Sequence, residues 1–127
     1  MFIMNNRASI IYISAIYIVL FPFLSAPLYA AAFCGPDVVP VTLTWRNGLV
    51  SVRPPWRNDW LGVCNLNVEW KGVPTSTCFA WFSQLNNAIA NGNEIMMYYA
   101  DLDQEDCANL PTGEISPAPD YVRISTQ

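Results

Sequence analysis

The sequence predicts a single small α+β domain, either a small antiparallel sheet or a small, partly open barrel, with one helix and two disulfides. Three observations predict this class. Short segments alternate apolar and polar residues and are separated by Gly, Pro and Asn. One longer segment has the periodicity of an amphipathic helix. Four cysteines occur in a chain of only 127 residues.

The N-terminal residues have the organisation of a signal peptide. A basic residue precedes the apolar stretch Ile10–Leu24, and Ala30–Ala32 supply the small side chains that a signal peptidase requires. A membrane anchor needs about 20 apolar residues, whereas this stretch is shorter and a proline interrupts its end. We therefore expect a signal peptide at 1–32 and one domain at 33–127, with cleavage before Phe33 or two residues earlier. The expected location is secreted or periplasmic, with no membrane contact after cleavage.

Charge and composition exclude several classes of function. Removal of the leader takes away one arginine, so the formal net charge changes from −4 to −5. An acidic domain is a poor partner for nucleic acid or an anionic membrane. The chain contains no histidine, so Ser-His-Asp and Cys-His catalysis are impossible. We expect a protein that is not an enzyme and that carries no cofactor.

All four cysteines, Cys34, Cys64, Cys78 and Cys107, follow the leader. An even number in a small exported domain predicts two disulfides. A zinc site is the alternative, but no C-x-x-C pair and no histidine are present to form one. Of the three possible pairings we favour Cys64–Cys107 with Cys34–Cys78.

The clearest local pattern is a β-hairpin. Residues 39–45 alternate, and Asn47-Gly48 is typical of a two-residue turn. The register across such a turn places Trp45 opposite Val50 and Leu43 opposite Val52, so that the apolar residues share one face. A third strand is expected from about Leu61 to Trp70. Its apolar face is formed by Cys64, Leu66, Val68 and Trp70, and its wet face by Asn65, Asn67 and Glu69.

The second half of the chain predicts one helix and two strands. Ser76 or Thr77 can cap a helix that begins at about Cys78 and ends at Asn91-Gly92. Its buried face is formed by Cys78, Phe82, Leu85 and Ile89. A central buried strand over Ile95–Ala100 and a closing strand over Tyr121–Ser125 follow, with an irregular connection over Leu110–Pro119.

Two resemblances add to this reading. The stretch Trp81–Tyr99 resembles the helix, glycine and following strand of subtilase-cytotoxin-type toxin B subunits, which are secreted, disulfide-bonded, OB-like barrels that form ring pentamers and bind sialylated glycans. Further motifs resemble an uncharacterised family of small exported, disulfide-bonded bacterial proteins; they are Cys34, Trp56-Arg57-Asn58-Asp59-Trp60, Cys64-Asn65-Leu66, Trp70-Lys71-Gly72-Val73, Cys78, Tyr98-Tyr99 and Pro117-Ala118-Pro119. The resemblances imply export, disulfides and an OB-like barrel, and no glycan-contacting residue carries over.

One cluster combines aromatic residues with side chains that form hydrogen bonds. It consists of Trp56, Arg57, Asn58, Asp59 and Trp60, our candidate ligand-binding residues, together with Trp45, Arg46 and Asn47. Aromatic faces stack on sugar rings, and Trp and Arg also anchor protein interfaces. The alternative is a structural role, with Trp45 on the buried face of the hairpin.

These features predict an exported, non-catalytic binding domain that contacts a glycan or a protein, and self-association into a homo-oligomer stays open. The alternative function is a small periplasmic or envelope inhibitor, or a structural protein, that acts by occlusion.

The acidic segment Asp101–Asp106 suggests a metal site only at first sight. Asp101, Asp103 and Glu105 place oxygen atoms at alternate positions, as calcium loops do. The segment lacks the glycine and the distant glutamate of an EF-hand loop, so a solvated acidic turn without metal is expected. Glu69 and Glu94 could serve in glycoside hydrolysis, but nothing in the sequence marks two carboxylates as a pair.

Overall fold

The computed structural model describes residues 30–126. The predicted signal peptide therefore lies outside the described residues except for its last three. The elements, in chain order, are β1 (Ala32–Val38), β2 (Thr42–Thr44), β3 (Leu49–Val52), β4 (Leu61–Asn65), α1 (Thr75–Asn91), β5 (Glu94–Tyr99), the 3₁₀ helix η1 (Gln104–Asn109) and β6 (Tyr121–Ser125). Among these residues, no helix is both long and apolar enough to cross a membrane.

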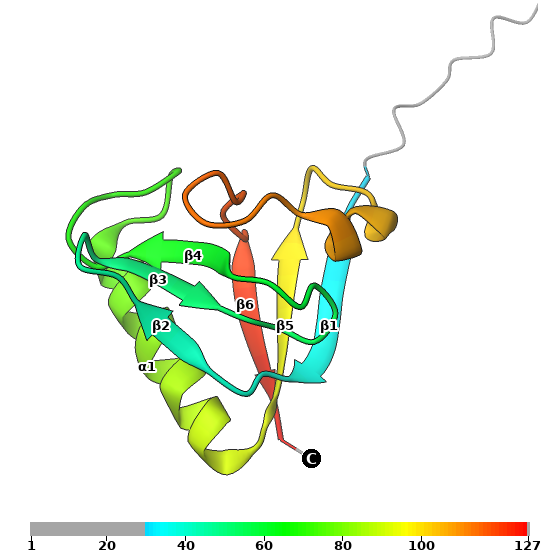
Figure 1. Cartoon of the computed structure of the whole chain (residues 1–127), viewed down its shortest axis with the longest axis horizontal. Coiled ribbons are helices and arrows are strands. Elements are labelled where there is room, and N and C mark those ends of the chain that lie inside the picture. The colour runs from blue at the N-terminus through cyan, green and yellow to red at the C-terminus, as the bar shows by residue number, and fades with distance from the viewer. Residues whose placement is uncertain (1–29, 127) are drawn as a thin grey trace, which may run out of the picture.

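The strands form two antiparallel sheets, in the orders β1-β5-β6 and β2-β3-β4. In Figure 1 the strands β2 to β4 cross β1, β5 and β6, and α1 lies along one side. One core lies between these layers and contains Val50 and Val63 from one sheet, Ile95 and Met97 from the other, and Leu85 from α1. The predicted α+β class with one helix and two disulfides is confirmed, and the sheets of residues 30–126 do not close into a barrel.

The predicted hairpin forms, but its register is shifted by one residue. Trp45 N donates to Leu49 O (2.9 Å), and Gly48 N donates to Trp45 O (2.9 Å). The turn therefore uses three residues instead of two, with Gly48 at φ 90°, a value that glycine adopts without steric cost. Because Leu43 consequently lies opposite Ser51, the side chains exchange faces relative to the prediction.

This shift places Trp45 on the outward face of its sheet. Val50 and Val52 belong to the core, so Trp45, which shares a face with Ser51, is directed away from it. The Trp45 side chain is 48% exposed. The alternative that Trp45 lies on the buried face of the hairpin is therefore wrong.

The third strand is shorter than predicted. β4 ends at Asn65 because the Asn65 side chain accepts hydrogen bonds from the backbone N–H of Asn67 (2.8 Å) and Val68 (3.3 Å). This bonding turns the chain out of the sheet. Val68, expected on an apolar strand face, is instead exposed.

The helix ends where the sequence predicts and begins three residues earlier. Gly92 has φ 66° and closes the C-terminus of α1. Helix α1 begins at Thr75 after Pro74, and no side chain caps its N-terminus. The predicted caps by Ser76 or Thr77 are therefore wrong, because both residues lie inside the first turn.

The sequence pattern did not predict β1. Gly35-Pro36 interrupts this strand with a β-bulge and a cis peptide bond, and these residues usually mark a turn. A Cβ at Gly35 would lie 2.6 Å from Ile95 O, so only glycine allows this approach. Ala32, the last residue of the predicted leader, is fully buried and pairs with Tyr99. The strand therefore begins inside the predicted leader.

Two disulfides are present, but the favoured pairing is wrong. The bridges are Cys34–Cys107 and Cys64–Cys78, with Cα–Cα distances of 5.5 and 5.4 Å. One bridge joins β1 to η1 and the other joins β4 to α1. The unpredicted strand β1 explains the error, because it is β1 that carries Cys34 to the segment containing η1.

Candidate functional site

The candidate residues 56–60 lie in the connection between β3 and β4, and the side chains of Arg57 and Asp59 bond within the protein. Arg57 Nε donates to Leu110 O (2.8 Å), and Asp59 Oδ1 accepts from Trp60 N (2.7 Å). Trp56 is half-buried and packs against the core. Asn58 adopts φ 55°, a left-handed conformation that asparagine tolerates better than most residues.

These bonds hold the segment that precedes β6 in place. Gly113 N donates to Trp60 O (2.9 Å), and Arg57 holds Leu110 three residues earlier. Both contacts join segments that lie more than 50 residues apart in the sequence. Residues 56–60 thus position the segment 110–113, and their role in binding a ligand stays a prediction.

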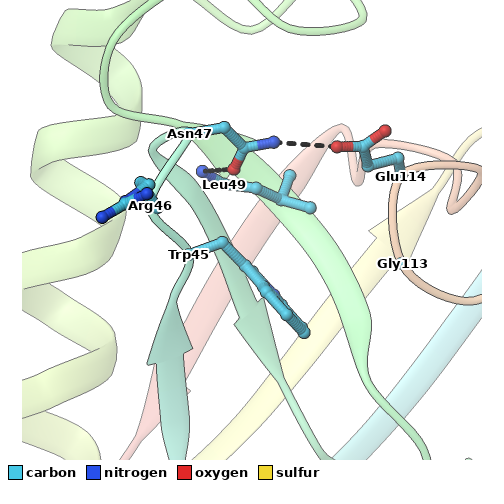
Figure 2. Close-up of a pocket in the computed structure, with 6 residues that line it drawn as sticks. All are labelled: Trp45, Arg46, Asn47, Leu49, Gly113 and Glu114. Carbon is cyan, nitrogen blue, oxygen red and sulfur yellow. Dashed lines mark hydrogen bonds between the residues drawn. The ribbon is translucent and has the colours of Figure 1, made fainter.

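The structure places three other members of the predicted cluster around a pocket (Figure 2). The pocket has a volume of about 450 Å³ and is lined by Trp45, Arg46, Asn47, Leu49, Gly113 and Glu114. We call it the Trp45 pocket. It lies where the turn between β2 and β3 meets the segment that residues 56–60 hold.

Hydrogen bonds fix the walls of the Trp45 pocket. Trp45 Nε1 donates to Ser51 Oγ (3.2 Å), and Ser51 is fully buried, so the indole ring has a set orientation. Asn47 Nδ2 donates to Glu114 Oε1 (2.8 Å), while Asn47 Oδ1 accepts from Leu49 N (3.1 Å). One asparagine side chain therefore ties the turn to Glu114 and also stabilises the turn itself (Figure 2).

The Arg46 side chain is directed away from the Trp45 ring in Figure 2. The apolar lining of the pocket therefore comes from the Trp45 indole and Leu49, and Glu114 also lines it. A carboxylate offers about four acceptor positions, so its bond with Asn47 leaves further capacity. The arrangement can hold a group that has one apolar face and hydroxyl or N–H donors at its edge.

Sequence reasoning missed Glu114 and Ser51. Glu114 lies in an irregular segment, 67 residues from Asn47 in the sequence, and no local pattern indicates that the two meet. Ser51 could have been found from the hairpin, because the correct register places Ser51 on the face of Trp45.

The acidic segment uses two carboxylates for its own structure, because Asp103 and Asp106 form a capping box at the N-terminus of η1. Asp103 N donates to Asp106 Oδ2 (2.9 Å) at the start of η1, and Cys107 in the same turn is tied to β1. Within residues 30–126, no group of three or more His, Cys, Asp or Glu side chains is arranged to hold a metal ion.

The chain matches none of the protein-family models, curated proteins or solved structures with which it was compared. The chemistry of the Trp45 pocket therefore rests on its own geometry.

Proposed function

We propose that this protein is an exported, non-catalytic binding domain that holds one ring of a glycan in the Trp45 pocket. The single observation that carries the proposal is the Trp45 indole, which is half-exposed and fixed by its bond to Ser51. A ring held in place before binding loses little conformational entropy when a ligand stacks on it.

The composition of the pocket suits a sugar. A pyranose has C–H groups on one face, which pack on an aromatic ring, and hydroxyl groups at its edge. Glu114 supplies acceptors for those hydroxyl groups, and Asn47 holds Glu114 in position at 2.8 Å. A volume of about 450 Å³ falls within the usual range of small-molecule sites, about 300–1,000 Å³.

Export is part of the proposal. The two disulfides are typical of oxidising compartments outside the cytoplasm, and the N-terminal pattern of the sequence is that of a secretory leader. The lack of histidine supports binding in preference to acid–base catalysis.

A glycan array probed with the oxidised protein tests the proposal, followed by titration of the strongest ligand. We expect Trp45→Ala to weaken binding at least tenfold, equivalent to about 1.4 kcal/mol. Glu114→Gln should also weaken binding, because it removes the charge while keeping an oxygen for Asn47. Phe79→Ala is the matched control, since Phe79 is an exposed aromatic residue of α1 outside the pocket. Unchanged binding by a folded Trp45→Ala variant would refute the proposal.

One observation favours a second candidate, a protein that binds a partner by occlusion. Ile115 is 73% exposed and lies in a turn closed by the bond from Ser116 N to Gly113 O (3.2 Å). A rigidly held, exposed aliphatic side chain can fill a pocket on another protein. If Ile115→Ser abolishes capture of a protein partner while Trp45→Ala does not, occlusion is the correct function.

A further inference from the structure

The sheet β1-β5-β6 has a second face that the core does not use. Ile95, Met97 and Tyr99 of β5 face the core, so Glu94, Met96 and Tyr98 lie on the opposite face. The strand register extends this face to both neighbours. Tyr98 pairs with Phe33 and Tyr121, Met96 pairs with Arg123, and Glu94 pairs with Val38 and Ser125. We call this surface the outer face.

Apolar side chains dominate the outer face where an antiparallel sheet usually presents polar residues to water. Phe33 is 46% and Tyr121 41% exposed, and Val38 is exposed as well, whereas Met96 in the middle row is buried. The Phe33 and Tyr98 rings lie 4.9 Å apart, and the Tyr98 and Tyr121 rings lie 4.7 Å apart. Three aromatic rings therefore form a continuous row across all three strands.

The two strands at the edges of this sheet are poorly suited to pairing with another strand. The bulge at Gly35-Pro36 distorts β1, and Arg123 occupies the middle of β6. Bulges, prolines and central charges are the usual devices against edge-to-edge pairing. Any association through this sheet therefore uses its face.

The outer face carries one residue of each charge in neighbouring rows. Arg123 lies in the middle row on β6, and Glu94 lies in the next row on β5. A face with both charges can complement a second copy of itself, because a two-fold axis that passes between the two residues brings Arg123 of each copy to Glu94 of the other.

We propose that a second copy of this chain covers the outer face in a two-fold dimer. An axis that lies in the plane of the face, diagonal to the strands, gives orthogonal sheet packing. In the register observed here, this operation places Arg123 of each copy over Glu94 of the other, and Tyr121 over Val38. Phe33 meets its own equivalent on the axis.

The size of the face sets the strength of the dimer. Three strands spaced about 4.8 Å apart and about five residues long give a contact well below the roughly 800 Å² per partner of a standard interface. The dimer therefore dissociates on dilution. This proposal is independent of glycan binding, because no residue of the outer face lines the Trp45 pocket.

Charge exchange tests the dimer by sedimentation equilibrium of the oxidised protein from 10 µM to 1 mM, on the order of the concentrations where weak interfaces assemble. We expect the wild-type average mass to rise towards twice the chain mass. Arg123→Glu alone and Glu94→Arg alone should remain monomeric, because each places like charges together. An equimolar mixture of the two variants should dimerise again, since both cross-copy pairs are then of opposite charge.

Arg53→Glu is the control for net charge, because Arg53 is exposed and lies just after β3 in the other sheet. This variant should behave as the wild type does. A monomeric wild type at 1 mM, on the order of the upper limit for such interfaces, overturns the proposal. Single variants that still dimerise overturn it as well, and so does a mixture that stays monomeric.

Discussion

The two disulfides close chain loops of very different length, and their contributions to stability should differ accordingly. Cys64–Cys78 spans 14 residues and Cys34–Cys107 spans 73. The short loop lies inside the long one and reduces its free length to about 59 residues. Loop-closure entropy then assigns about 3.0 kcal/mol to the short bridge and about 4.2 kcal/mol to the long bridge. All four cysteines are buried, so replacement by alanine costs similar packing at each pair.

The prediction is tested with two double variants, Cys34→Ala with Cys107→Ala and Cys64→Ala with Cys78→Ala, each unfolded by urea without reductant. The variant without the long bridge should be less stable than the variant without the short bridge by about 1.2 kcal/mol. This difference corresponds to about 5–10 °C in Tm for a domain of this size. Alkylation before unfolding confirms that the remaining bridge is intact. Equal stabilities, or a larger loss at Cys64–Cys78, would refute the entropic reasoning.

Three further predictions concern single side chains. Burial raises the pKa of Tyr99 above its usual value of 10.0. The free energy of unfolding should therefore be unaffected by this group below about pH 10 and fall above it by up to 1.4 kcal/mol per pH unit, about the linkage limit for one proton. In urea titrations at different pH values, Tyr99→Phe should remove this contribution to the loss of stability. Gly48→Ala should destabilise more than Gly92→Ala in the same assay, because both have positive φ but only a Cβ at Gly48 meets side-chain atoms at 2.7 Å; equal losses would contradict this. Ser116→Ala should cost about 1–3 kcal/mol by leaving the buried N–H of Gly62 without its acceptor, and a loss below about 0.5 kcal/mol would show that another acceptor replaces it.

The sequence predicted the elements whose patterns are local. The helix end at Gly92 and the strands β5 and β6 follow from a left-handed cap and from short apolar or alternating segments. The length of β4 was wrong because the Asn65 side chain accepts hydrogen bonds from the backbone N–H groups of Asn67 and Val68. Alternation continues past Asn65 in the sequence, so the pattern alone cannot show where pairing stops.

Whether Trp45 faces the core or the outside depends on a one-residue shift in the pairing of β2 with β3. With a two-residue turn at Asn47-Gly48, Trp45 would face the core; with the observed three-residue turn it faces outward. Asn-Gly is compatible with both turn lengths. The choice is made by the full structure, in which Val50 and Val52 supply the core face of β3. For this reason the sequence identified Trp45 as a member of the cluster but not the face on which it lies.

Long-range pairing explains the remaining errors. The disulfide partners and the contact between Asn47 and Glu114 each depend on where β1 and the segment before β6 lie. Neither segment has a regular pattern, since Gly35-Pro36 interrupts one and prolines interrupt the other. Their positions follow from the packing of the whole domain.

The two proposed surfaces belong to different sheets, and this separation has a consequence for binding strength. Trp45 lies on the face of β2-β3-β4 directed away from the core, and the aromatic row lies on the corresponding face of β1-β5-β6. A dimer through the outer face therefore leaves both Trp45 pockets open and joins them in one particle. Two linked sites convert the second binding event into an intramolecular one. A surface coated with the glycan should then retain the wild type more strongly than Arg123→Glu, although both bind a free monovalent sugar equally. Equal retention at concentrations where the wild type is dimeric would show that the two pockets cannot reach one surface together.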